Sequence, residues 1–149
     1  MNVFDALKIK YPYPEWVVLE QVKTSTGVKE NYGGSRYIDF FIMNCYPSKE
    51  YQCLSIEAKQ SIGDFRSDIK NPYKQLPARF YSDGFYYLLD EDVFNKNKEE
   101  IFSSLGINND GLMVLGERGI KVIRRANMQQ EKSPFSFGFV ASLLRNNRS

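Results

Sequence analysis

In two segments in the first half of the chain, the pattern of apolar and polar residues predicts β-strands. Residues 36–45 and 51–58 are rich in aromatic and branched side chains, which favour strands. The polar stretch 46–50 between them contains Pro47 and predicts a turn. The pattern therefore predicts a β-hairpin, followed by a helix that begins near Ser61 or Asp64.

Side chains of a strand alternate between its two faces, so parity sorts the residues of this hairpin. One face carries Asp39 on the first strand and Glu57 and Lys59 on the second. If the hairpin closes near Ser48, Asp39 lies opposite Glu57, with Cβ atoms about 5 Å apart. The other face is predicted to be an apolar wall of alternate residues: Ile38, Phe40, Ile42, Leu54, Ile56 and Ala58.

Two close carboxylates repel each other unless a cation lies between them, and oxygen ligands suit Mg²⁺. Lys59 beside them could orient a metal-bound water, help to deprotonate it, or stabilise charge on a phosphate. The pattern thus contains the groups needed for metal-assisted phosphodiester hydrolysis. An ion pair on a solvated strand face is the alternative interpretation, because Glu-X-Lys is a common triplet.

Asp39 followed by Glu57-Ala58-Lys59 after a hairpin resembles the motif of the PD-(D/E)XK nuclease superfamily. Over about residues 15–126, the chain is similar to the MmcB-like DNA-repair proteins and related small phage proteins of that superfamily. The residue before Asp39 is Ile38, where the motif has proline. The matching positions are Glu57, Lys59, Ser61, Asp64, Phe65, Lys74, Phe85, Tyr87, Gly111 and Leu112.

This resemblance implies a deoxyribonuclease that depends on Mg²⁺ or Mn²⁺ and acts in DNA repair or phage DNA processing. It implies an α/β fold with a restriction-endonuclease-like core: a mixed central β-sheet flanked by helices on both faces. Asp39 and Glu57, helped by the Ala58 carbonyl, would hold the metal, and Lys59 would be the catalytic lysine. The implied partners are DNA and a second copy of the chain in a homodimer.

Three further residues are candidates for the same site. Glu20, inside a predicted strand at residues 16–23, would be an additional metal ligand or an exposed strand residue. Gln60 and Ser61 follow the triplet. They would hydrogen-bond a phosphate or a water, or else cap the following helix.

The predicted helix after the hairpin has a polar face with three basic residues, Arg66, Lys70 and Lys74. These residues would bind the DNA backbone, or they would form a solubilising face balanced by nearby acids. Pro72 interrupts the segment and predicts a kink or two consecutive helices. The buried face is predicted from helical spacing and comprises Phe65, Ile69, Tyr73, Leu76 and Phe80.

The remaining elements follow from shorter patterns. Helices are predicted at residues 2–10, 93–105 and 135–145, with Gly106 ending the second of them. Residues 84–89 read as a buried strand, and residues 112–115 and 120–123 as a hairpin. Residues 24–34 are predicted to form a polar loop, residues 129–133 a linker, and residues 146–149 a frayed end.

Composition narrows the possible chemistry. The chain has two cysteines and no histidine, which excludes a Ser-His-Asp triad, a Cys-His pair and the usual zinc sites. Cys45 and Cys53 are predicted to be neighbours across the turn and to be buried thiols rather than a disulfide. A site must therefore be built from carboxylates, lysine and hydroxyl groups.

Length and charge place the chain in a broad class. Residues 1–149 are expected to form a single domain. The net charge of +2 does not by itself indicate a nucleic-acid partner. No apolar run approaches 18 residues and no signal-peptide core is present, so a cytoplasmic protein without a membrane partner is expected. Two other functions remain open: a nuclease-like fold that binds DNA or protein without cutting, and an interaction protein with no nucleic-acid role.

Overall fold

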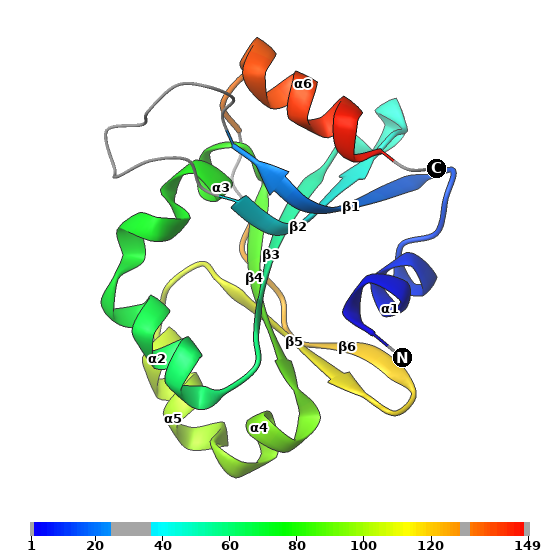
Figure 1. The fold of residues 1–149 in the computed structure, drawn as a ribbon. Coiled ribbons are helices and arrows are strands. Elements are labelled where there is room, and N and C mark those ends of the chain that lie inside the picture. The colour runs from blue at the N-terminus through cyan, green and yellow to red at the C-terminus, as the bar shows by residue number, and fades with distance from the viewer. Residues whose placement is uncertain (1, 25–36, 129–131, 148–149) are drawn as a thin grey trace.

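A computed structural model describes residues 2–24, 37–128 and 132–147 of the chain (Figure 1). A single six-stranded sheet runs through the molecule, with its strands in sequence order from one edge to the other. Its strands are β1 (Trp16–Lys23), β2 (Tyr37–Asn44), β3 (Cys53–Lys59), β4 (Gly84–Asp90), β5 (Gly111–Gly116) and β6 (Gly119–Arg124). The helices are α1 (Val3–Lys10), η1 (Pro47–Lys49), α2 (Ile62–Lys70), η2 (Pro72–Gln75), α3 (Leu76–Phe80), α4 (Glu91–Lys96), α5 (Lys98–Leu105) and α6 (Phe137–Asn146).

The sheet is mixed. Strands β1, β2 and β3 are antiparallel neighbours, whereas β3, β4 and β5 run parallel to one another, and β6 returns antiparallel to β5. Parallel neighbours need a crossover. The crossover from β3 to β4 is made by α2, η2 and α3, and that from β4 to β5 by α4 and α5.

Local signals in the sequence explain where several helices begin and end. The side chain of Asn2 accepts a hydrogen bond from the Asp5 amide at 2.8 Å, and Ser61 caps α2 in the same way. These contacts satisfy amides that have no partner inside the helix. The predicted interruption at Pro72 is confirmed, because α2 ends at Lys70 and a 3₁₀ turn begins at Pro72.

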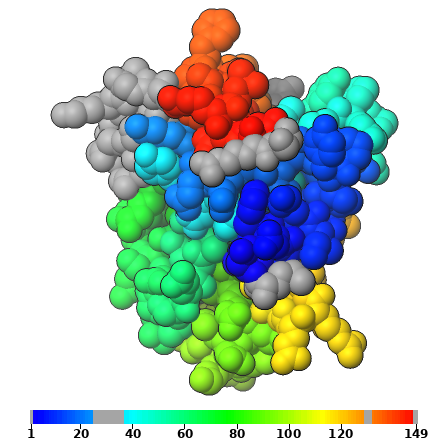
Figure 2. Space-filling model, turned by 45° about the vertical axis from the view of Figure 1, so that its right-hand side comes forward, coloured from blue at the N-terminus to red at the C-terminus, as the bar shows by residue number. Residues whose placement is uncertain are grey.

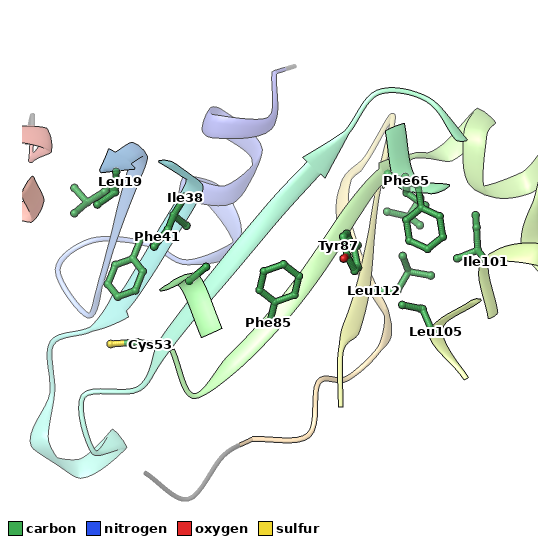
Figure 3. Packing of buried hydrophobic residues seen from close by; sticks show 14 of the residues in the cluster. Leu19, Ile38, Phe41, Cys53, Phe65, Phe85, Tyr87, Ile101, Leu105 and Leu112 are labelled. Carbon is green, nitrogen blue, oxygen red and sulfur yellow. The ribbon is translucent and has the colours of Figure 1, made fainter. Parts of the chain in front are cut away.

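Both faces of the sheet are buried. On one face, residues from α2, α5 and α6 pack against the strands, and Figure 3 shows part of this cluster, with the Phe65 and Tyr87 rings 5.2 Å apart. On the other face, Leu7 of α1 packs against apolar residues of β2, β3 and β4. The predicted α/β architecture, with a mixed sheet and helices on both faces, is therefore confirmed.

The predicted apolar wall is correct except at Ile38. Phe40 and Ile42 pack in the cluster on the α1 face, but Ile38 packs with Phe41 in the cluster on the other face. The alternation breaks beside Gln21, which lies in β1 next to this point and has a φ of 53°. The left-handed residue belongs to β1, however, and no residue of β2 has a positive φ, so the break between Ile38 and Phe40 has no explanation in the conformation of β2 itself.

Two other predictions have a clear outcome. Cys53 is buried and free, as expected, but the prediction that Cys45 is buried is wrong, since Cys45 is exposed. Cys53 pairs with Met43 rather than with Cys45, which is the register that also places Asp39 opposite Glu57. Residues 25–34 of the expected loop at 24–34, residues 129–131 of the expected linker at 129–133, and residues 148–149 of the expected frayed end at 146–149 lie outside the described residues. In the part of the chain that the structure describes, no helix is long and apolar enough to cross a membrane.

Candidate active site

The predicted meeting of Asp39 and Glu57 is supported by the register of the hairpin. Phe40 pairs with Ile56, so the next residues along, Asp39 and Glu57, face each other at the end of the ladder. An oxygen of Asp39 accepts a hydrogen bond from the Ala58 amide at 3.0 Å. That bond fixes the Asp39 carboxylate against the edge of β3, beside the Glu57 side chain.

Lys59 is held between two carboxylates. Its Nζ lies 3.2 Å from Oε1 of Glu57 on the same strand. It also lies 2.9 Å from Oδ2 of Asp68, which comes from the second turn of α2. The same Oδ2 atom accepts a hydrogen bond from Nε2 of Gln75 at 2.5 Å. A series of contacts from Gln75 through Asp68 and Lys59 to Glu57 therefore links the β3–β4 crossover to β3.

The pKa values of this cluster are shifted by burial and by the neighbouring charges. Burial, and then the charge of Asp39, raise the pKa of Glu57 to about 7. Burial likewise raises the pKa of Asp39, against the opposing hydrogen bond from the Ala58 amide. Burial opposes the charge on Lys59, but its hydrogen bond to Asp68 and its acidic neighbours raise the Lys59 pKa overall. Lys59 is therefore a fixed cation and not a proton acceptor near neutral pH.

These groups line an open pocket of about 800 Å³ beside the ends of β3 and β4. The pocket is rich in acids, because Asp64 and Asp90 join Asp39, Glu57 and Asp68 on its walls. Its other described lining residues are Val3, Gln21, Phe40, Ala58, Lys59, Gln60, Ser67, Lys74, Leu88, Val93 and Leu115. A cavity with an excess of carboxylates favours a cationic ligand.

The structure separates Glu20 from this pocket. Glu20 is exposed and lines a different groove, on the side of β1 that faces α1. Its neighbour Gln21 lines the carboxylate pocket, and its side chain hydrogen-bonds Asp39, which opposes the rise of the Asp39 pKa caused by burial. Of the two interpretations of Glu20, the exposed strand residue agrees with the structure. Both faces of β1 carry apolar side chains, so parity could not show which residue would face the pocket.

The remaining predicted residues are divided between the pocket and the surface. Gln60 and Lys74 line the pocket, whereas Ser61 caps α2 through its side chain. Arg66 points to α5, where its guanidinium binds both carboxylate oxygens of Glu100. Lys70 is exposed at the last turn of α2. Of the predicted basic trio, Lys74 is therefore the one in the pocket.

Sequence reasoning missed three residues of the site. Asp68 had a usable signal, since it lies three residues after the buried Phe65 and so on the same side of α2. Gln75 had none, because it reaches Asp68 from a 3₁₀ turn whose direction sequence does not fix. Gln21 had none either, because a positive φ at a residue other than glycine is not encoded by a simple pattern.

The residues present fit a small divalent cation in one respect. Asp39 and Glu57 converge at one place, where burial raises the pKa of both carboxyl groups and the charge of Asp39 adds to the rise at Glu57. Mg²⁺ is commonly held by only one or two carboxylates, with water and phosphate completing its shell. Among residues 2–24, 37–128 and 132–147, no three His, Cys, Asp or Glu side chains form a ready metal cluster. A fuller shell would therefore need the substrate, and the Ala58 carbonyl as a ligand stays a prediction.

Comparison with known proteins establishes a fold only. No protein-family model matches the sequence, and no curated protein matches it. Among solved structures, the chain is similar to the SPO1766 protein of unknown function from Silicibacter pomeroyi, at 15% identity and with a TM-score of 0.57. The match covers 97% of this chain and 80% of that chain. At this identity, the likeness extends to the arrangement of strands and helices and not to chemistry.

Proposed function

We propose that this chain is a metal-dependent nuclease of the PD-(D/E)XK type that hydrolyses phosphodiester bonds of DNA. The observation that carries the proposal is the convergence of Asp39, Glu57 and Lys59 in one acidic pocket. The sequence resemblance named the same three residues. The order of elements around them supports a restriction-endonuclease-like core, because a mixed sheet with helices on both faces brings the two carboxylate strands together.

Each residue has a task that follows from its position. Asp39 and Glu57 would hold the metal, which when bound supplies a polarised water and charge neutralisation at the phosphate. Lys59, kept charged by Asp68, would hold the attacking water or a phosphate oxygen in place and stabilise developing negative charge. Its raised pKa argues against a role as the base. Gln60 and Lys74 line the pocket where they could contact the backbone of the bound strand.

A binding module that does not cut is the second candidate. The contact that favours it is the ion pair between Lys59 and Glu57, with Nζ 3.2 Å from Oε1. This ion pair between Lys59 and Glu57 would also be expected if the two residues had only a structural role. In that case, DNA or protein binding would not require Asp39 and Glu57 together.

The test is cleavage of single-stranded, duplex and branched DNA with Mg²⁺ or Mn²⁺. Wild type should cut in the presence of metal, and the Glu57→Ala and Lys59→Ala variants should not. Glu99→Ala is the matched control, because Glu99 is exposed on α5 and should keep full activity. If no substrate is cut, or if Glu57→Ala and Lys59→Ala still cut, the catalytic assignment is wrong and the binding module is favoured.

A further inference from the structure

A second groove, of about 800 Å³, lies on the side of the molecule where α1 approaches β1. Four aromatic side chains line it: Phe4, Tyr11, Tyr13 and Trp16. The end of α6 closes the groove through Asn146. Figure 2 looks towards this side, where α1 is dark blue and α6 is red.

Tyr13 is the accessible ring of this aromatic groove, whereas Phe4, Tyr11 and Trp16 are partly buried, and two lysines lie close to the rings. Tyr13 is 73% exposed, and Tyr11 meets Trp16 edge to face with ring centres 4.9 Å apart. Lys8, which also lines the groove, holds its Nζ 4.9 Å from the Phe4 ring centre. Lys10 extends over Tyr11 at 6.0 Å. Glu20 is the one acid of the described lining, and Lys8 and Lys10 outnumber it. Flat apolar rings bordered by these ammonium groups suit a ligand that has both aromatic faces and negative charge.

One residue joins the aromatic groove to the carboxylate pocket. Gln21 lines both cavities, and its side chain hydrogen-bonds Asp39. Its φ of 53° is unusual for a residue with a side chain in the middle of a strand. Such a conformation persists where the surrounding structure requires it, and it is common at functional sites. A chain-like ligand could therefore pass from one cavity to the other beside Gln21.

We propose that the aromatic groove binds the bases of a single-stranded nucleic acid whose backbone continues past Gln21 into the carboxylate pocket. This inference rests on the proposed nuclease function and specifies its substrate as single-stranded at this place. Bases of a single strand can stack on Tyr13 and Trp16, since every base has a π-face, and Lys8 can contact a neighbouring phosphate. In a duplex the same base faces are already stacked on each other and cannot reach the rings.

Trp16 makes the proposal directly measurable, because it is the single tryptophan of the chain. Its fluorescence is recorded during titration with oligothymidylate, and separately with a blunt duplex, in EDTA so that no strand is cut. Quenching by oligothymidylate at concentrations where the duplex has no effect is expected. Equal responses to both ligands, or none to oligothymidylate, would overturn the proposal. A response to a proline-rich peptide alone would overturn it too, since aromatic grooves also accept such peptides.

The variant Tyr13→Ala removes one exposed ring without disturbing the core. We expect its affinity for oligothymidylate to fall by about tenfold, the effect of losing one base-stacking contact. Tyr51→Ala is the matched control, because Tyr51 is also exposed but lies outside both cavities. Equal affinities of the two variants would contradict the assignment of the groove. These binding measurements need no metal. Their outcome is therefore independent of the cleavage test of the nuclease.

Discussion

Oδ2 of Asp68 lies 2.9 Å from Nζ of Lys59, although the two residues belong to different elements and Asp68 is buried. This contact ties the position and the charge of Lys59 to helix α2. Asp68 is itself fixed by Gln75. Asp68 is thus a positioning residue, which acts on the candidate site through Lys59.

The first prediction concerns the charge of Lys59. In Asp68→Asn, Lys59 loses its strongest partner while burial continues to oppose its charge, so its pKa should fall. The NMR titration of ¹³C-labelled lysine measures this directly. If the protein cuts DNA, the alkaline limb of its pH–rate profile should move to lower pH as well. Asp64→Asn is the control on the same helix, and a Lys59 pKa that is equal in both variants would contradict the role of Asp68.

The second prediction follows from the raised pKa of Glu57. Between its ordinary value of 4.5 and its folded value of about 7, the folded chain holds a proton that the unfolded chain has released. The free energy of unfolding should therefore fall as pH rises through this window, by about 2 kcal/mol once partial screening by solvent is allowed for. In Glu57→Gln this decrease should be much smaller.

Urea unfolding at pH 5 and at pH 8 provides the measurement for Glu57. The exposed Glu99→Gln should show the same pH dependence as wild type. A small decrease should remain in Glu57→Gln, because burial also raises the pKa of Asp39. Identical pH dependence in wild type and Glu57→Gln would mean that the carboxylates do not interact as described.

The third prediction separates Lys74 from Arg66. Lys74 lines the pocket, whereas Arg66 is bound to Glu100, with Nη2 2.7 Å from Oε1. Lys74→Ala should weaken DNA binding and reduce the slope of log affinity against log salt by about 1, the loss of one phosphate contact. Arg66→Ala should change the slope much less. The two slopes are measured by fluorescence anisotropy over a range of salt, and a larger effect of Arg66 would place the DNA along the outer face of α2.

The fourth prediction tests how α6 is attached to the sheet. Phe139 is fully buried and packs against Phe41 and Tyr81, with ring centres 5.2 Å and 4.0 Å away. Phe139→Ala should lower the free energy of unfolding by about 3–5 kcal/mol because it leaves a cavity. Phe137 is 94% exposed on the same helix, and Phe137→Ala should change stability by less than about 0.5 kcal/mol. Chemical denaturation of both variants gives the comparison, and similar losses would contradict the docking of α6.

Much of the fold could be predicted because its elements are encoded locally. The alternation of residues 36–45 and 51–58 placed the hairpin, and the register that brings Asp39 opposite Glu57 followed from the turn between them. Helix ends were marked by short signals such as Ser61 and Pro72. These features depend on a few neighbouring residues, and a single sequence contains them.

The rest of the site depends on contacts between separate elements of the fold, and local patterns do not predict such contacts. Asp68 reaches Lys59, and Gln75 reaches Asp68, only because the crossover brings α2 and η2 beside β3. Sequence pointed to Glu20 rather than Gln21 because β1 carries apolar residues on both faces. The alternation along such a strand does not show which face lies towards the pocket. Ile38 was misplaced because the alternation of β2 breaks between Ile38 and Phe40, opposite the left-handed Gln21 of β1, and no local pattern in the sequence marks that break.

The crossover between β3 and β4 limits which insertions the sequence of this protein can accept. Glu57, Lys59, Asp68 and Gln75 belong to one continuous piece of chain, whereas Asp39 comes from β2 and Gln21 from β1. Most of the site is therefore encoded in one short segment of the sequence. Insertions at the β5–β6 hairpin or beyond α6 would leave its parts in place, whereas one added residue between Lys59 and Asp68 would turn the acid away from its partner. Variation should accordingly accumulate at the edges of the sheet and spare the length of this short segment.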